Sequence, residues 1–196
     1  MAHRRLPDHY NRRAHAEGMP ARSVYKLEEI DQKLDLFARG GRVLDLGCRP
    51  GSWSAYVRQR GGAETRILGV DIEPVQGFPG EFLCISVDDL TPELVLQRLG
   101  GAPDVVLSDM APSTMGNKDV DHLRQIALAE AALAVAVRLL PRGGSFVCKV
   151  FDGRDAVAFY ESVRACFTEV KRVRPKATRK ESREFFLVAR GFQAPA

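Results

Sequence analysis

Long apolar runs are absent from this sequence of 196 residues. No uninterrupted apolar stretch approaches the ~20 residues that a membrane-spanning helix needs. The N-terminal region carries Arg4, Arg5, Arg12 and Arg13 and contains no apolar stretch of the kind found in secretory signals. We therefore expect a soluble, cytoplasmic protein that makes no use of a membrane.

Closely paired cysteines are also missing. The four cysteines, Cys48, Cys84, Cys148 and Cys166, are widely spaced and form no Cys-x-x-Cys pattern. This spacing gives no support to the common zinc-ligand arrangements. Most of the four lie inside apolar segments, so we expect reduced, buried thiols and no metal site.

Disorder, internal repeats and a second domain are likewise not indicated. Hydrophobic residues make up 45% of the chain and charged residues 28%, which is the balance of a folded domain and not of a disordered chain. The length suits one domain, and no linker interrupts the sequence. We expect a single domain over residues 1–196 that acts as a monomer.

Charge is unevenly distributed, although the net charge is only +4. Residues 1–26 hold six Lys or Arg against two acids, and residues 171–190 hold eight against two. The body between them, residues 27–170, holds 15 basic and 21 acidic residues. Two basic ends on an acidic body favour a polyanion, RNA or DNA, bound at one rim. Ordinary solvated charge at the ends is the alternative.

A series of short strands alternates with helical patterns. Apolar positions at helical spacing predict a helix over 119–140, which Pro141 ends, and a second over about 155–167. Such alternation is typical of a mostly parallel α/β sheet with helices on both faces, in which ligands bind at the carboxyl ends of the strands. The last two strands would pair antiparallel. The predicted strands are 42–46, 66–71, 81–87, 104–109, 144–151, 169–175 and 183–190.

A glycine turn follows the first predicted strand. In "LDLGCRPGSWS" (44–54), Gly47 and Gly51 bracket a tight turn that contains Pro50, and a helix begins near Ser52. A ligand can approach the backbone at such a turn, although a simple packing turn is the alternative. The spacing matches neither the Gly-Lys-Ser/Thr end of a P-loop nor the Gly-x-Gly-x-x-Gly of dinucleotide sites. The turn therefore suits a ligand less anionic than a phosphate chain.

Acidic residues stand at the ends of the next two predicted strands. Asp71 ends the second strand, 26 residues after Asp45, where a carboxylate in an α/β sheet can accept both hydroxyls of a ribose. Asp88 and Asp89 follow the third strand, where a carboxylate could accept an adenine amino group. Helix capping or a solvated loop is the alternative for each acid alone. Together with the glycine turn, the acids favour a nucleoside cofactor.

Separate motifs occur in order along the chain, from "ARSVYKL" (21–27) and "LDLGCRPGSWS" (44–54) to "TRKESREFF" (178–186). Together they resemble one known family, the FtsJ-type (RrmJ-type) ribose 2′-O-methyltransferases. The family uses S-adenosylmethionine and includes the enzyme that methylates a uridine of 23S rRNA in the large ribosomal subunit. The resemblance covers nearly the whole chain. It implies a Rossmann-like methyltransferase fold with a mostly parallel seven-stranded sheet, an antiparallel C-terminal strand and helices on both faces. The motifs are "ARSVYKL" (21–27), "LDLGCRPGSWS" (44–54), "GVDIEP" (69–74), "LSDMAPSTMG" (107–116), "GGSFVCKVF" (143–151) and "TRKESREFF" (178–186).

The resemblance implies a catalytic tetrad at Lys26, Asp109, Lys149 and Glu184. Methyl transfer to a ribose hydroxyl needs alignment of donor and acceptor and removal of a weakly acidic proton. Lys149 follows an apolar strand, where burial beside a second cation such as Lys26 favours the uncharged amine. We predict that Lys149 accepts the proton and that Asp109 orients it and faces the sulfonium. Lys26 and Glu184 would place the ribose. Taken singly, each residue except Asp109 is better explained as a solvated lysine or a hairpin ion pair, and a turn cap is the alternative for Asp109; the matching motifs together favour the functional interpretation.

The sequence departs from the family near the predicted cofactor site. Arg49 stands where the family has a small residue, and we expect it to point outward toward RNA because a guanidinium beside a cationic donor is unfavourable. Strict motif spacing puts the adenine-contacting acid at Ser86, so that the choice between Asp88 and Asp89 stays open. Trp53 matches a tryptophan beside the family's cofactor, with helix packing as the alternative.

RNA would be held by the basic ends, because the sequence contains no aromatic RNA-recognition signature. Phosphate contacts read no base sequence, so the target is only implied by the resemblance: a uridine of 23S rRNA, with tRNA as the nearest alternative. A non-catalytic ribosome-assembly factor and a nicotinamide dehydrogenase are further alternatives. The intact tetrad argues against the first and the glycine spacing against the second. The candidate phosphate contacts are Arg4, Arg5, Arg12, Arg13, Arg22, Lys176, Arg179 and Lys180.

Overall fold

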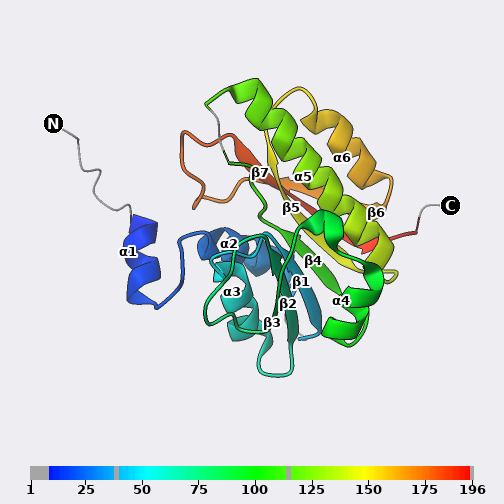
Figure 1. Cartoon of the computed structure of the whole chain (residues 1–196). Helices are drawn as coiled ribbons and strands as arrows, with labels where there is room; N and C mark the ends of the chain where they lie inside the picture. Colours follow the sequence, from blue (N-terminus) through cyan, green and yellow to red (C-terminus); the bar gives the residue numbers. More distant parts are fainter. Residues whose placement is uncertain (1–8, 38–39, 114–115, 195–196) are drawn as a thin grey trace.

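One seven-stranded sheet forms the centre of the molecule, in the strand order β3-β2-β1-β4-β5-β7-β6 (Figure 1). The structure is a computed structural model that describes residues 9–37, 40–113 and 116–194. The predicted phosphate contacts Arg4 and Arg5 lie outside these residues. The strands are β1 Arg42–Leu46, β2 Arg66–Asp71, β3 Glu81–Cys84, β4 Val105–Ser108, β5 Ser145–Phe151, β6 Phe167–Val173 and β7 Glu184–Phe192.

Strand β7 alone runs against its neighbours. It pairs antiparallel with both β5 and β6, whereas β1 to β5 pair in parallel. This arrangement confirms the predicted mostly parallel sheet with an antiparallel C-terminal strand. In the register of the β5–β7 pair, Lys149 lies opposite Phe186 and Phe151 lies opposite Glu184.

Helices cover both faces of the sheet, as expected. Helices α2 and α3 pack on one face, with α1 beside α2, and α4 to α6 pack on the other face. Several ends carry recognisable caps: Thr91 accepts the Leu94 N–H before α4, and Asn117 accepts two N–H groups before α5. The helices are α1 His9–Ala16, α2 Val24–Leu34, α3 Ser52–Gly61, α4 Pro92–Leu99, α5 Lys118–Leu139 and α6 Ala156–Arg164, with a short 3₁₀ helix, η1, over Val87–Asp89.

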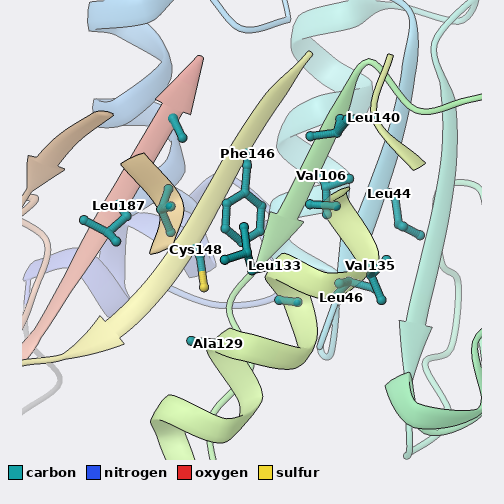
Figure 2. Close-up of a cluster of buried hydrophobic side chains, with 14 of the residues drawn as sticks. Leu44, Leu46, Val106, Ala129, Leu133, Val135, Leu140, Phe146, Cys148 and Leu187 are labelled. Carbon is teal, nitrogen blue, oxygen red and sulfur yellow. The ribbon is translucent and has the colours of Figure 1, made fainter. Parts of the chain in front are cut away.

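Alternation along the strands divides the core into two layers. On β5, Phe146 and Cys148 pack against α5 and α6, and Figure 2 shows this layer between the sheet and α5. Val147 points to the opposite face, where α2 and α3 lie. Because side chains two apart share a face, Lys149 is directed to the α2 and α3 side.

The third strand differs from its prediction. It ends at Cys84 and not at residue 87, because Ser86 caps η1 by accepting the Asp88 N–H at 3.2 Å and so turns the chain out of the sheet. Strand β3 is also an edge strand, which leaves Cys84 exposed instead of buried. All four cysteines are free, and Cys48 and Cys148 are buried.

The helix predicted over about 155–167 is shorter than expected. It ends at Arg164, and β6 begins at Phe167, inside the range predicted as helical. Phe167 is buried among Phe146 and Phe192, so that pairing with β7 and core packing outweigh local helical spacing. Among the described residues, no helix is long and apolar enough to cross a membrane.

Candidate active site

The glycine turn after β1 lies directly against the segment after β4. Gly47 has φ 69°, and a Cβ there would lie 2.5 Å from the Met110 Cγ. Only glycine combines this conformation with so close an approach. Its N–H donates to the Val70 carbonyl at 2.8 Å, which ties the turn to the end of β2. The turn therefore joins the ends of β1, β2 and β4 at one place.

A cavity of about 840 Å³ opens at these strand ends, and we call it the strand-end cavity. It sits where the connections from β1 and β4 diverge, which is where open α/β sheets bind nucleotides. Four predicted cofactor residues line it: Gly47, Asp71, Asp88 and Asp109. The remaining lining includes Leu46, Arg49, Pro50, Val70, Ile72, Glu73, Ile85, Ser86, Val87, Met110, Ala111, Pro112, Ser113, Arg124, Ala127, Leu128 and Ala131.

Three predicted cofactor residues do not line the strand-end cavity. Gly51 caps α3 with φ 96° and so shapes the turn from outside. Asp89 is exposed at the end of η1, beside Asp88. Trp53 is 2% exposed, donates its indole N–H to the Ser23 carbonyl at 3.0 Å, and has the helix-packing role that was its alternative.

The Asp71 carboxylate is held in place by backbone donors. Its two oxygens accept the Arg49 N–H at 2.9 Å and the Glu73 N–H at 3.0 Å. Each oxygen keeps a lone pair for a ligand hydroxyl. The Arg49 guanidinium is exposed as expected, but it pairs with the Glu73 carboxylate at 3.0 Å on the cavity rim.

An exposed apolar side chain follows Asp71. Ile72 is 73% exposed and lines the strand-end cavity. Sequence reasoning missed it, although a large apolar residue directly after a candidate ribose-binding acid was a usable signal. The site thus offers an apolar surface next to a carboxylate, which matches the two halves of a nucleoside.

Asp45 is the most strongly perturbed acid near the cavity. Its side chain is fully buried beneath α3, where one oxygen accepts the Ser54 hydroxyl at 2.6 Å and the other has no hydrogen-bond partner. Burial raises its pKa to about 7, and the nearby charges of Asp109 and Asp71 add to the effect. The sequence placed Asp45 only as a spacing reference.

The first tetrad pair is formed by Lys149 and Asp109. The Lys149 Nζ lies 2.9 Å from the Asp109 Oδ1 and donates to the Asp109 carbonyl at 2.6 Å. The Oδ1 contact is not aligned as a hydrogen bond, so this buried oxygen keeps its acceptor capacity. Lys149 is only 6% exposed.

Gln125 fixes the backbone beside Lys149. Strand β4 ends at Ser108, so the last residues of β5 have no strand partner on that side. The buried Gln125 amide fills this place: it donates to the Lys149 carbonyl at 2.6 Å and accepts the Phe151 N–H at 2.9 Å. A lone glutamine on a long helix carried no signal for this role.

The second tetrad pair is formed by Lys26 and Glu184. The Lys26 Nζ lies 2.5 Å from the Glu184 Oε1, and both side chains are 12% exposed. Lys26 also lies 5.7 Å from the centre of the Phe186 ring, and Phe186 is the cross-strand partner of Lys149. The sequence-predicted tetrad therefore forms two ion pairs on one face of the sheet, with Phe186 between them.

Asp109 connects the two parts of the site. It lines the strand-end cavity and also contacts Lys149. A group that enters the cavity as far as Asp109 therefore lies beside the tetrad. Within the ranges that the structure describes, no cluster of three or more His, Cys, Asp and Glu is arranged to hold a metal ion.

The two basic segments meet beside the tetrad. The Glu29 carboxylate of α2 accepts the Lys176 N–H at 2.6 Å, and the Arg22 guanidinium donates to the Ala177 carbonyl. Arg22 is thus engaged inside the protein. Arg13 likewise pairs with two glutamates and stacks over the Tyr25 ring. The side chains of Arg12, Lys176, Arg179 and Lys180 are exposed.

A doubly wound sheet with a cavity at its switch point defines this chain as a Rossmann-like α/β protein, and such folds bind their ligands at this place. The sequence profile of the FtsJ-like methyltransferase family matches residues 19–192, and the chain belongs to that family.

Curated relatives carry one common name. A protein of Desulfatibacillum aliphaticivorans named "Ribosomal RNA large subunit methyltransferase E" is 46% identical over 184 residues, which cover 92% of this chain and 88% of that protein. A protein of the same name from Bdellovibrio bacteriovorus is 45% identical over 185 residues, covering 92% of this chain and 94% of the relative.

Solved structures share the fold. A crystal structure described as a ribosomal RNA methyltransferase from Plasmodium falciparum superimposes with a TM-score of 0.79 at 26% identity, over 89% of this chain and 99% of the other. A structure described as an rRNA-methylase from Clostridium thermocellum has a TM-score of 0.59 at 15% identity, over 85% of this chain and 97% of the other, and shows likeness of fold alone.

Proposed function

We propose that this protein transfers the methyl group of S-adenosylmethionine to a ribose 2′-hydroxyl of RNA, at a uridine of 23S rRNA in the large ribosomal subunit. One observation carries the proposal: Asp109 belongs both to the strand-end cavity and to the tetrad. The names of the curated relatives support ribosomal RNA over tRNA as the substrate.

The strand-end cavity fits the chemistry of this donor. Asp71 presents two fixed carboxylate oxygens to the ribose hydroxyls, and Asp88 stands where an adenine amino group would donate. Ile72 supplies an apolar contact for the base. The glycine turn lacks the Gly-Lys-Ser/Thr end of a P-loop, in agreement with a ligand that carries no phosphate. When bound, S-adenosylmethionine supplies an electrophilic methyl group on a sulfonium.

Lys149 is the proton acceptor in this proposal. An uncharged lysine amine has two N–H bonds and one lone pair, and one N–H donates to the Asp109 carbonyl, while the Asp109 Oδ1 lies 2.9 Å from the Nζ without hydrogen-bond alignment. The lone pair can then face the acceptor ribose and take the hydroxyl proton. Burial of Lys149 keeps water from competing for the same position.

Lys26 and Glu184 position the acceptor ribose. Their ion pair offers one donor and one acceptor group at a half-buried place, and a ribose hydroxyl can use both. Correct alignment is the largest demand of an in-line displacement, so loss of either group should lower turnover more than donor affinity.

RNA reaches the tetrad across the joined basic segments. Exposed Lys and Arg side chains neutralise phosphates and release counterions, which gives affinity without base readout. Arg12 lies on α1, which contacts α2 through Arg13 and Glu28, and the other three exposed candidates lie on the loop between β6 and β7 that leads into Glu184. A single domain thus carries both the donor site and the RNA surface.

Methyl transfer with mapped products tests the proposal. Purified protein would be incubated with isotope-labelled S-adenosylmethionine and, in parallel, with unmethylated large subunits, free 23S rRNA and tRNA. We expect label at the 2′-oxygen of one uridine of 23S rRNA in the subunit. Lys149→Ala should bind the donor and transfer no label. Label in tRNA alone, or full transfer by Lys149→Ala, would contradict the proposal.

A further inference from the structure

The loop between β6 and β7 is folded back onto the helix that carries Lys26. Residues 174–183 form this loop, and at its tip Ala177 is 1% exposed and Thr178 is 8% exposed. Glu29 of α2 accepts the Lys176 N–H, and Arg22 donates to the Ala177 carbonyl. The tip of the loop is therefore anchored to the α2 region.

Arg174 anchors the other end of the same loop. It is the first residue after β6, and its guanidinium donates to three backbone carbonyls: Ser182 at 2.6 Å, Glu184 at 3.2 Å and Arg179 at 3.4 Å. A guanidinium holds five N–H groups in a rigid plane, so it can bridge several carbonyls at once, whereas a lysine ammonium acts as a single point. Arg174 thus ties together the return half of the loop.

The segment that Arg174 holds leads directly into Glu184. Glu184 is the first residue of β7, where strand ends tend to open. Its N–H donates to the Ser182 hydroxyl at 3.2 Å, and the Asp152 N–H donates to the Arg183 carbonyl at 2.8 Å. With the Arg174 bonds, these contacts fix the backbone from which the Glu184 carboxylate reaches Lys26.

We propose that Arg174 is a positioning residue for methyl transfer, which holds the β6–β7 loop so that the Glu184 carboxylate meets Lys26. This inference rests on the function proposed above. It separates Arg174 from the neighbouring basic residues: Lys176, Arg179 and Lys180 would act on the RNA phosphates, whereas Arg174 acts on the protein backbone.

Charge and geometry give different expectations for Arg174→Lys. A phosphate contact needs only a positive charge, so lysine would restore it. A bridge between three carbonyls needs the guanidinium plane, so lysine would not. We therefore expect Arg174→Ala and Arg174→Lys both to lower kcat by about 10- to 100-fold, because a displaced catalytic group loses alignment.

The experiment uses the full-length protein with large ribosomal subunits as substrate. It compares wild type, Arg174→Ala, Arg174→Lys, Glu184→Gln and the double variant Arg174→Ala/Glu184→Gln. Arg98→Ala is the matched control: it removes an exposed arginine of α4, outside both basic segments, whose partner is the exposed Glu81, and kcat should stay within about 2-fold. Donor affinity is measured by calorimetry, and thermal unfolding checks that each variant is folded.

If Arg174 acts through Glu184, the kcat of the double variant is only slightly lower than the kcat of Glu184→Gln alone. Donor affinity stays at the wild-type value in every variant. Full rescue of kcat by lysine, multiplicative losses in the double variant, or a change confined to the KM for RNA would each overturn the inference. If Arg174→Ala does not fold, the lysine variant decides. Absence of transfer by wild type with normal donor affinity would refute the proposed function instead.

Discussion

Replacement of Asp45 by asparagine should make the stability of the protein less dependent on pH. Asp45 is completely buried, and its pKa is raised to about 7 from an ordinary value of 3.8. Between these two pH values the folded protein keeps the proton that the unfolded chain has already lost. Because the folded state then holds more protons, the free energy of unfolding falls as pH rises through this window.

The size of the effect follows from the shift. A pKa difference between 3.8 and about 7 corresponds to about 4 kcal/mol of lost stability once the pH exceeds 7. Asparagine has nearly the same shape and does not ionise, and its carbonyl can accept the Ser54 hydroxyl. Its amide group takes the place of the carboxylate oxygen that has no hydrogen-bond partner, and the cost of burying it is the same at every pH. Between pH 5 and pH 8, Asp45→Asn should therefore gain about 3 kcal/mol relative to wild type.

Urea unfolding at several pH values measures this difference. Wild type, Asp45→Asn and the control Asp35→Asn would be unfolded at pH 5, 6, 7 and 8. Asp35 is an exposed carboxylate of a surface ion pair, so its replacement should change the pH dependence by less than about 1 kcal/mol. Parallel pH profiles for wild type and Asp45→Asn would refute the assignment of a protonated, buried acid below the glycine turn.

Three further predictions concern the site itself. Asp71→Asn should weaken S-adenosylmethionine binding by about 10- to 100-fold in calorimetry, because a ribose hydroxyl loses a charged acceptor; unchanged affinity would remove Asp71 from the donor site. Lys149→Ala should abolish transfer while calorimetry finds donor affinity within about 3-fold of wild type, and retained turnover would assign the proton to another group. Gln125→Leu should lower the free energy of unfolding by about 1–3 kcal/mol, since it leaves the Lys149 carbonyl with only the weak Cys148 thiol donor and deprives the half-buried Phe151 N–H of its acceptor; an unchanged urea midpoint would contradict that role.

Strand positions were largely predictable because buried parallel strands are short, continuous apolar runs between turn residues. The ranges 42–46 and 66–71 match β1 and β2 to the residue. The end of β3 was not predictable in the same way, because the Ser86 cap redirects a sequence that still has strand propensity. Likewise, the start of β6 is set by pairing with β7, which no local pattern encodes.

The tetrad was predicted through its resemblance to a family, whereas its supporting residues were not. Gln125 acts on a backbone carbonyl 24 residues away and Arg174 on carbonyls 5 to 10 residues away across a loop, and neither belongs to a recognisable motif. Trp53 shows the opposite case: its motif suggested a cofactor contact, but its position on α3 directs the indole toward Ser23 and Phe186. Such roles depend on how helices dock on the sheet, which spacing alone does not specify.

A crystal structure with bound S-adenosylmethionine tests the central claim most directly. We predict that the donor ribose binds the Asp71 carboxylate and that the methyl group lies beside Asp109, where it faces the Lys149 amine and the Lys26–Glu184 pair. A donor that occupies the strand-end cavity with its methyl group turned away from Asp109, or that binds elsewhere on the protein, would contradict it.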